Sequence, residues 1–196
     1  MADYFSLLAF IIIMVGTPGP ANLVLMTAGS RYGFFASVPF IGGITMGKLL
    51  LNTLLILGLY SWLEREPMLL VGLKFISAGY MIWLSFRMMR DQPSTATETI
   101  TPPGFLAGLI VHPLNPKAWA MTTIALADYG PMLADPVERF VVIAGSFVMV
   151  QLCFHSLWCY GGSWIMRMIS TERGRLFFQQ GLALITVALV LWIVMT

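Results

Sequence analysis

Two proline-rich interruptions within apolar stretches contain residues whose types and spacing could bind a charged small molecule. The first covers residues 16–20, Gly-Thr-Pro-Gly-Pro, and the second covers residues 112–117, His-Pro-Leu-Asn-Pro-Lys. A proline inside a helix has no amide hydrogen to donate and clashes with the preceding turn, at a cost of about 3 kcal/mol. It also disfavours the helical conformation for the residue before it. We therefore expect each interruption to divide a helix into two half-helices.

The half-helix that begins after each interruption would provide a site for an anion. Asn115 is a favourable N-cap residue, and Pro116 is a favourable first helical residue. In the first interruption, Thr17 or Gly19 could cap a helix that begins at Pro20. The start of a helix exposes amide groups and carries about half a positive charge. Such helix ends bind carboxylates and other anions.

The half-helix that ends before each interruption would provide a site for a cation. These helices are expected to end near Val15 and Ile110, where their last carbonyl groups lack helical partners. Free carbonyl oxygens suit an ammonium group, so the two kinds of helix end together fit a zwitterion. Lys117 follows the second interruption and would add positive charge to the anion site.

Lysines in the middle of apolar stretches are also candidates for function. Lys48 lies near the centre of such a stretch and shares one helical face with Thr45 and Asn52. It either holds the negative group of a substrate or is a structural lysine held by backbone carbonyls and Asn52. Lys74 lies nearer a segment end, where its side chain could reach the membrane interface. The predicted substrate-binding residues are Thr17, Pro18, Gly19, Pro20, Asn22, Lys48, Asn52, Asn115, Pro116 and Lys117.

The two histidines of the chain, His112 and His155, are candidates for proton transfer, because the ordinary pKa of histidine is about 6.5. His155 shares a helical face with Gln151, four residues earlier. A purely packing histidine is the alternative at each position. All nine acidic residues fall in loops or at segment ends, so a buried carboxylate is not available to carry a proton.

The composition predicts an all-α membrane protein. Of the 196 residues, 58% are hydrophobic and only 10% are charged, whereas about 25% are charged in a typical soluble domain. A helix needs about 20 apolar residues to span a bilayer. We expect one domain over residues 1–196 with six transmembrane helices, at about residues 4–28, 34–62, 67–89, 104–127, 140–166 and 176–195.

The charge pattern predicts that the two halves of the chain form inverted repeats. A polar segment at residues 91–103 separates residues 4–90 from residues 104–195, with three spans in each half. Lysine and arginine are enriched in cytoplasmic loops. This rule places both termini outside, because Arg31, Arg87, Arg90, Arg167, Arg173 and Arg175 lie on one side and only Arg65 and Arg139 on the other. Proline-interrupted segments in corresponding places of two repeats point to a transporter binding site, although each could also be an ordinary proline kink.

Several classes of partner are not expected. The net charge of +2 and the lack of a basic cluster argue against nucleic acid. Cys153 and Cys159 are expected to be buried apolar residues, and no zinc-type spacing or other cofactor motif is present, so we predict no metal and no cofactor. Two G-x-x-x-G pairs, at residues 43–47 and 104–108, indicate close helix packing, either within the chain or in a homo-oligomer.

The chain resembles the LysE/RhtB family of bacterial amino-acid exporters over nearly its whole length. The resemblance rests on Thr17-Pro18-Gly19-Pro20, on Ala78-Gly79-Tyr80-Met81-Ile82-Trp83-Leu84, on Gly104-Phe105-Leu106 and on Leu114-Asn115-Pro116-Lys117-Ala118. It implies a six-span carrier of the bacterial inner membrane that exports amino acids or small relatives, coupled to the proton gradient.

We therefore expect an exporter of neutral or acidic amino acids, or of related small carboxylates, that works by alternating access. Lys48 and Lys117 would repel a cationic substrate, and no acidic residue lies at mid-membrane to offset one. The alternatives are a channel, a membrane scaffold protein or an intramembrane enzyme. The enzyme is disfavoured because Ser156 directly follows His155, and adjacent positions on a helix do not face each other.

Overall fold

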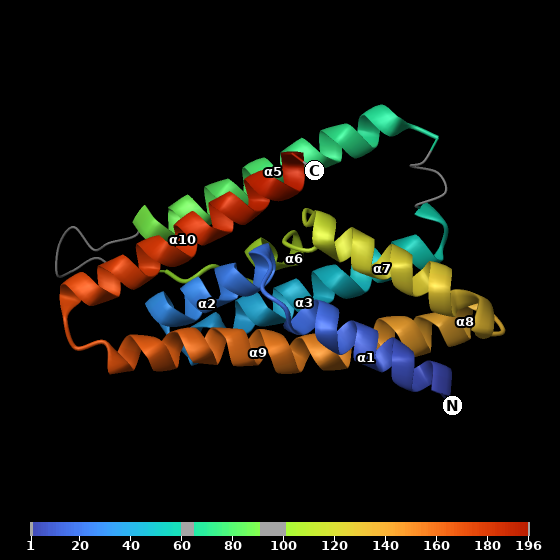
Figure 1. Cartoon of the computed structure of the whole chain (residues 1–196), viewed down its shortest axis with the longest axis horizontal. Helices are drawn as coiled ribbons and strands as arrows, with labels where there is room; N and C mark the ends of the chain where they lie inside the picture. The colour runs from blue at the N-terminus through green and yellow to red at the C-terminus, as the bar shows by residue number, and fades with distance from the viewer. Residues whose placement is uncertain (1, 60–64, 91–100, 196) are drawn as a thin grey trace.

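The computed structural model describes residues 2–59, 65–90 and 101–195, and all regular elements in these residues are helical. With the labels of Figure 1, the first half contains α1 (Ala2–Gly16), α2 (Pro20–Tyr32), α3 (Phe34–Ile56) and α5 (Pro67–Arg90). The second half contains α6 (Phe105–Leu109), α7 (Pro116–Tyr129), the 3-10 turn η1 (Gly130–Met132), α8 (Pro136–Arg139), the π-helical turn η2 (Phe140–Ala144), α9 (Gly145–Met168) and α10 (Glu172–Met195). The prediction of an all-α protein is confirmed.

Four of the six predicted spans are long and apolar enough to cross a membrane. Three are continuous helices, Phe34–Ile56, Pro136–Met168 and Glu172–Ile193. The fourth is the pair α1 and α2, which bends by 54° at the first interruption. In the places of the third and fourth predicted spans, the described residues of α5 and of the pair α6–α7 do not meet the combined requirement of length and apolarity, although α5 is as long as α3. The number of six spans therefore stays a prediction.

Several helix boundaries differ from the predicted ones. The fifth span begins at Pro136 rather than at residue 140, because the Asp135 carboxylate accepts hydrogen bonds from the amides of Val137 and Glu138 at 2.8 and 2.9 Å. An aspartate before a proline is a helix-start signal, and it extends this span by one turn. The second span ends at Ile56, followed by Gly58 with a φ of +96°. Its predicted end at residue 62, and residues 91–100 of the predicted loop, lie outside the described residues.

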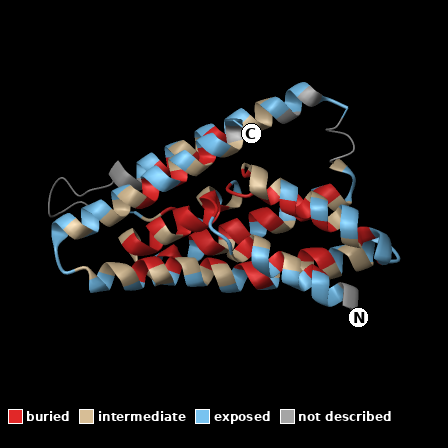
Figure 2. Cartoon of the chain, in the orientation of Figure 1, coloured by how far each residue is buried: buried red, intermediate tan, exposed pale blue. Residues whose placement is uncertain are grey.

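The helices form a central group and a flanking pair (Figure 1). In the central group, α2 and α3 both contact α9, while α6 lies against α3. The flanking pair consists of α5 and α10, which run side by side and meet the central group through α2. Figure 2 shows that the buried residues gather along α2 and α3, at the centre of the molecule.

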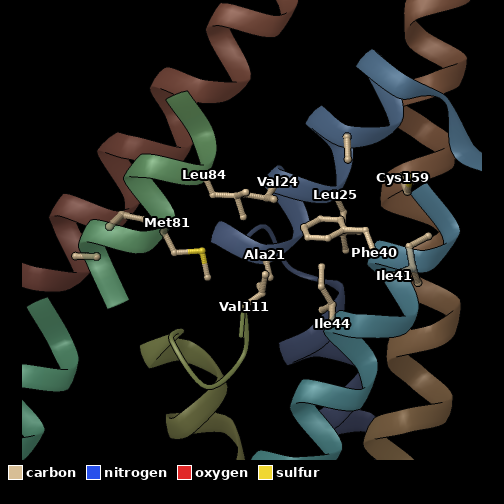
Figure 3. Close-up of a cluster of buried hydrophobic side chains, with 13 residues drawn as sticks. Ala21, Val24, Leu25, Phe40, Ile41, Ile44, Met81, Leu84, Val111 and Cys159 are labelled. Atoms are coloured by element: carbon tan, nitrogen blue, oxygen red, sulfur yellow. The ribbon is translucent and has the colours of Figure 1, made fainter. Parts of the chain in front are cut away.

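Two apolar cores lie on opposite sides of the interruptions. The first core, drawn in Figure 3, comprises Ala21, Val24, Leu25, Ala28, Phe40, Ile41, Ile44, Ala78, Met81, Leu84, Val111, Cys159 and Val190. The second core comprises Leu7, Ile11, Val15, Leu51, Leu55, Ala118, Met121, Ala125, Leu133, Ile143, Phe147 and Val150. The chain passes from one core to the other within each interruption, between Val15 and Ala21 and between Val111 and Ala118. Whatever binds at the interruptions therefore lies between the two cores.

The predicted G-x-x-x-G pairs are used inside the chain. A side chain at Gly43 or Gly47 would overlap the backbone of α6, and one at Gly108 would overlap the backbone of α3. Gly104, by contrast, has open space around it. Three of the four glycines thus serve the contact between α3 and α6, which favours the explanation of packing within the chain.

Candidate functional site

The first interruption is an extended segment that leaves the start of α2 without a side-chain cap. Gly19 is the N-cap residue, with φ −159° and ψ 167°, and Pro20 is the first residue of α2. The Thr17 hydroxyl points the other way and donates to the Met14 carbonyl at 3.1 Å. Of the two predicted caps, the structure therefore selects Gly19. Pro20 has no amide hydrogen, and the Leu23 amide donates to the Gly19 carbonyl at 3.0 Å. The amides of the first turn that lack helical acceptors, and are available to an anion, are therefore those of Ala21 and Asn22.

The second interruption is closed by its own polar groups. The Asn115 side chain accepts a hydrogen bond from the Lys117 amide at 3.1 Å, and the Asn115 carbonyl accepts one from the Ala118 amide at 2.8 Å. The Trp119 indole donates to the Pro113 carbonyl at 2.8 Å. The predicted cap at Asn115 is confirmed, but it occupies the amides that were expected to hold an anion. Of the two predicted anion sites, only the start of α2 is open.

The carbonyls near Val15 and Ile110, which were expected to hold a cation, already accept hydrogen bonds within the protein. Asn22 Nδ2 donates to the carbonyls of Val15 at 2.8 Å and Thr17 at 3.0 Å, because this side chain lies in the first turn of α2 and folds back over the end of α1. The Ile110 carbonyl accepts from the Leu114 amide at 3.0 Å, because the chain makes a further turn before Asn115. Each of these carbonyls keeps a second lone pair, so a cation site at them stays a prediction.

A small cavity of about 20 Å³ lies between the two interruptions. It is lined by four of the predicted substrate-binding residues, Gly19, Asn22, Asn115 and Lys117, together with both predicted proton-transfer residues, His112 and His155. Its remaining polar lining residue is Gln151. Ala21 and the side chains Met14, Val15 and Met121 complete the wall. Six of the eleven lining residues are thus polar, and both halves of the chain contribute to the cavity.

His112, Gln151 and His155 form a buried group that we call the histidine cluster. The two imidazole rings stack with their centres 5.4 Å apart and their planes 25° apart. Gln151 Nε2 lies 3.2 Å from His112 Nε2. The three side chains are at most 2% exposed, yet Nδ1 of each histidine and Oε1 of Gln151 have no hydrogen-bond partner in the protein. Gln151 was not among the predicted site residues, although its four-residue spacing from His155 places both side chains on one helical face.

Lys48 lies outside the cavity and links α3 to α7. It is fully buried, and its ammonium donates to the Ala118 carbonyl at 2.7 Å and to the Thr122 hydroxyl at 2.5 Å. The Thr122 hydroxyl in turn donates to Asn52 Oδ1 at 2.7 Å, and the Phe147 ring centre lies 4.4 Å from the ammonium. These contacts fit a structural lysine. Asn52 supports it through Thr122 rather than directly, and it does not line the cavity either.

Lys117 lies between the cavity and a larger, open groove. Its ammonium donates to the Thr17 hydroxyl at 2.9 Å and to the Thr17 and Pro18 carbonyls at 3.2 and 3.4 Å. The groove holds about 670 Å³ of empty space and is lined by Pro18, Gly19, Pro20, Pro116, Lys117, Ala120, Leu189, Trp192 and Ile193. A side chain at Gly19 would come within 3.1 Å of the Lys117 chain. Glycine at this position therefore leaves room for Lys117 to cross from one interruption to the other.

The chain matches the family described as LysE type translocators over residues 12–194. It belongs to this family. Members of the family are transporters, so this LysE-type translocator is not an enzyme.

Relatives of this LysE-type translocator share its length as well as its sequence pattern. It is 25% identical to a cysteine/O-acetylserine efflux protein of Klebsiella pneumoniae, over 83% of each chain. It is also 25% identical to an uncharacterized membrane protein of Pseudomonas aeruginosa, over 83% of this chain and 80% of that one. A leucine efflux protein of Klebsiella pneumoniae is 21% identical, over 87% of this chain and 84% of that one. No solved structure matches this chain.

The remaining candidate ligands of the translocator do not assemble a metal site. In the described part of the chain, no three His, Cys, Asp or Glu side chains are grouped so that they could hold a metal ion. Both cysteines are free; Cys159 is buried as expected, but Cys153 is exposed. The prediction of burial was wrong for Cys153 because it lies on the outer face of α9, where an apolar side chain is also suited to lipid.

Proposed function

We propose that the protein is a secondary active exporter of neutral or acidic amino acids, or of related small carboxylates, across the bacterial inner membrane. It is driven by the proton gradient and works by alternating access around the two interruptions. The observation that carries this proposal is the cavity between the interruptions, which is built from both halves of the chain and flanked by an apolar core on either side. The efflux proteins among its relatives support the direction and the class of substrate.

The substrate carboxylate binds at the start of α2. This helix end has no side-chain cap, and Ala21 and Asn22 of its first turn line the cavity. Lys117 lines the same cavity and adds a positive charge. A helix start and a lysine together favour a carboxylate. A lysine or arginine substrate would add a charge that none of the cavity-lining residues offsets.

The distribution of lysine and arginine supports an orientation in which both termini lie outside. The C-terminal end of α2, near residues 31–33, would then lie on the cytoplasmic side, and so would the N-terminal end of α6, near residues 101–104. This orientation can be tested by placing a cysteine at Ser94 in a protein that carries Cys153→Ser and Cys159→Ala. An impermeant thiol reagent applied to intact cells should leave it unlabelled, and efficient labelling would reverse the orientation.

Counterflow in liposomes tests the proposed function directly. The purified protein is reconstituted into vesicles loaded with unlabelled L-leucine, L-cysteine, L-glutamate or L-lysine, and entry of the same labelled amino acid is followed. At least one neutral or acidic amino acid should show saturable uptake that depends on the internal substrate. Flux that neither saturates nor depends on internal substrate would indicate a channel. Counterflow of L-lysine alone would contradict the proposed substrate class.

A further inference from the structure

We propose that the histidine cluster binds the ammonium group of the substrate and that a proton competes with the substrate for this place. The inference rests on the proposed function and adds the step that couples export to protons. In this proposal Gln151 contacts the substrate directly. A histidine that holds a proton prevents the amino acid from binding.

The unpartnered atoms of the cluster define what it can bind. As placed, Gln151 Nε2 donates to His112 Nε2, which leaves Gln151 Oε1 as a buried acceptor without a donor. If the amide were turned over, Oε1 would accept from His112 Nε2, and His112 Nδ1 would become the free acceptor. One acceptor remains free in either arrangement. His155 adds another, because a neutral imidazole always keeps one nitrogen with a lone pair.

An ammonium group is the ligand that these acceptors lack. It has three donors and no acceptor. At the interruptions, the Val15 carbonyl already accepts from Asn22 and the Ile110 carbonyl from Leu114. Among the residues that the structure describes, no acidic side chain lines the cavity. The cluster therefore provides buried acceptors that have no donor of their own, and the start of α2 takes the other end of the zwitterion.

A proton on either histidine would prevent the ammonium from binding. Protonation removes the acceptor lone pair of that ring and places a positive charge 5.4 Å from the centre of the other ring. The ionisable groups that act on the cluster from the neighbouring helices are Lys48 on α3 and Lys117 on α7, and each, when charged, opposes a proton on the rings. Binding of the zwitterion therefore returns one proton to the solution, and loss of the zwitterion allows one proton to bind. A carrier with this exchange moves a proton inward for each amino acid that it moves outward.

The test measures binding and proton release with the purified full-length protein. Labelled L-leucine is the probe, and 4-methylpentanoate, which is the same molecule without the ammonium group, is the matched control. Since the chain has only two histidines, His112→Asn with His155→Asn removes every imidazole while keeping amide acceptors in place. The native protein should bind L-leucine about tenfold more weakly per pH unit on the acidic side of the transition and should release a proton on binding. The affinity for 4-methylpentanoate should not fall in this way at low pH.

Two variants sharpen the result. The double histidine variant should bind L-leucine more weakly and without the pH dependence that the native protein shows. Gln151→Leu should weaken L-leucine binding about tenfold and leave 4-methylpentanoate binding unchanged, while Gln180→Leu, an exposed position on α10, should change neither. If the double variant does not fold, the proton release of the native protein and the Gln151→Leu comparison still decide.

The outcomes separate this inference from the proposed function. L-leucine binding that is independent of pH and releases no proton would overturn the competition and leave the export proposal standing. The double histidine variant could lose the pH dependence while the Gln151→Leu variant binds L-leucine as tightly as the native protein. That combination would remove Gln151 from the site. Failure of L-leucine, L-cysteine and L-glutamate to bind at any pH would overturn both proposals.

Discussion

The helices meet in different ways at the two ends of the molecule. Where α2 meets α9, and α3 meets α6, backbone lies directly on backbone: a side chain at Gly29 would overlap the carbonyl of Cys159, and one at Gly162 would overlap that of Met26. At the other end, α1 and α7 meet α3 and α9 through the side chains of the second core. The first end is held by glycines, and the second by Leu, Ile, Val, Met and Phe side chains.

This difference indicates which end is closed. Backbone contact leaves no space for a substrate to pass between α2 and α9 or between α3 and α6. Contacts made by side chains can be exchanged for others as rotamers change, so the end formed by α1 and α7 is the one suited to open. Lys48 and its bonds to α7 lie at this second end and restrain it. Four experiments test the comparison, from the largest expected effect to the smallest.

The largest effect is expected from Gly162→Ala at the closed end. The added methyl group would overlap the backbone of α2 at Met26 and Ser30, and backbone cannot move aside as a flexible side chain can. Overpacking typically costs 1–3 kcal/mol, and we expect about 3 kcal/mol or more here. Gly161→Ala is the matched control, because Gly161 is the neighbouring residue and has open space around it. Thermal unfolding in detergent compares the two, and equal stability would show that the end is not tightly closed.

The next effect concerns the interruptions between the two ends. Pro20→Ala and Pro116→Ala would allow helix to extend through the interruptions and should abolish counterflow, while the protein still inserts and folds. Pro39→Ala, at a proline inside the continuous helix α3, is the control and should transport at close to the native rate. Native transport in both interruption variants would mean that these prolines only bend the helices.

An intermediate effect is expected from Lys48→Met. Methionine keeps the volume but removes a buried amino group with no carboxylate beside it, so the melting temperature should be unchanged or higher. Transport should nevertheless fall about tenfold, because the link between α3 and α7 is lost. Lys74→Met, at a partly exposed position on α5, should have little effect. Unchanged transport in Lys48→Met would show that this link has no part in the transport cycle.

The smallest effect compares one hydrogen bond at each end. Ser163 donates to the Gly29 carbonyl at 2.7 Å between α9 and α2, and it is buried. Ser163→Ala should cost about 1 kcal/mol of stability. Tyr4→Phe removes an exposed hydroxyl that lies 3.3 Å from Glu138, and it should leave stability unchanged within about 0.5 kcal/mol. A larger loss from Tyr4→Phe than from Ser163→Ala would contradict the assignment of the closed end.

The sequence by itself determined the features that depend on neighbours along the chain. The prolines at 18, 20, 113 and 116 required the interruptions, and Asn115 before Pro116 required a capped helix start, because these effects act within one turn. The apolar composition likewise determined that the protein is helical and suited to a membrane. The sequence also contained the signal for the early start at Asp135-Pro136, which the hydrophobic pattern alone did not reveal.

Only the tertiary structure decided which polar groups are free and which are occupied. Asn22 covers the carbonyls expected to hold a cation, and Lys48 finds its partner in Thr122, 74 residues away. Gln151 joins the cavity because it meets His112, 39 residues away, rather than because of any local pattern. Such pairings depend on where separate helices cross, and the crossing points are decided by packing, here by the glycines of α2, α3 and α9, which let the backbones touch.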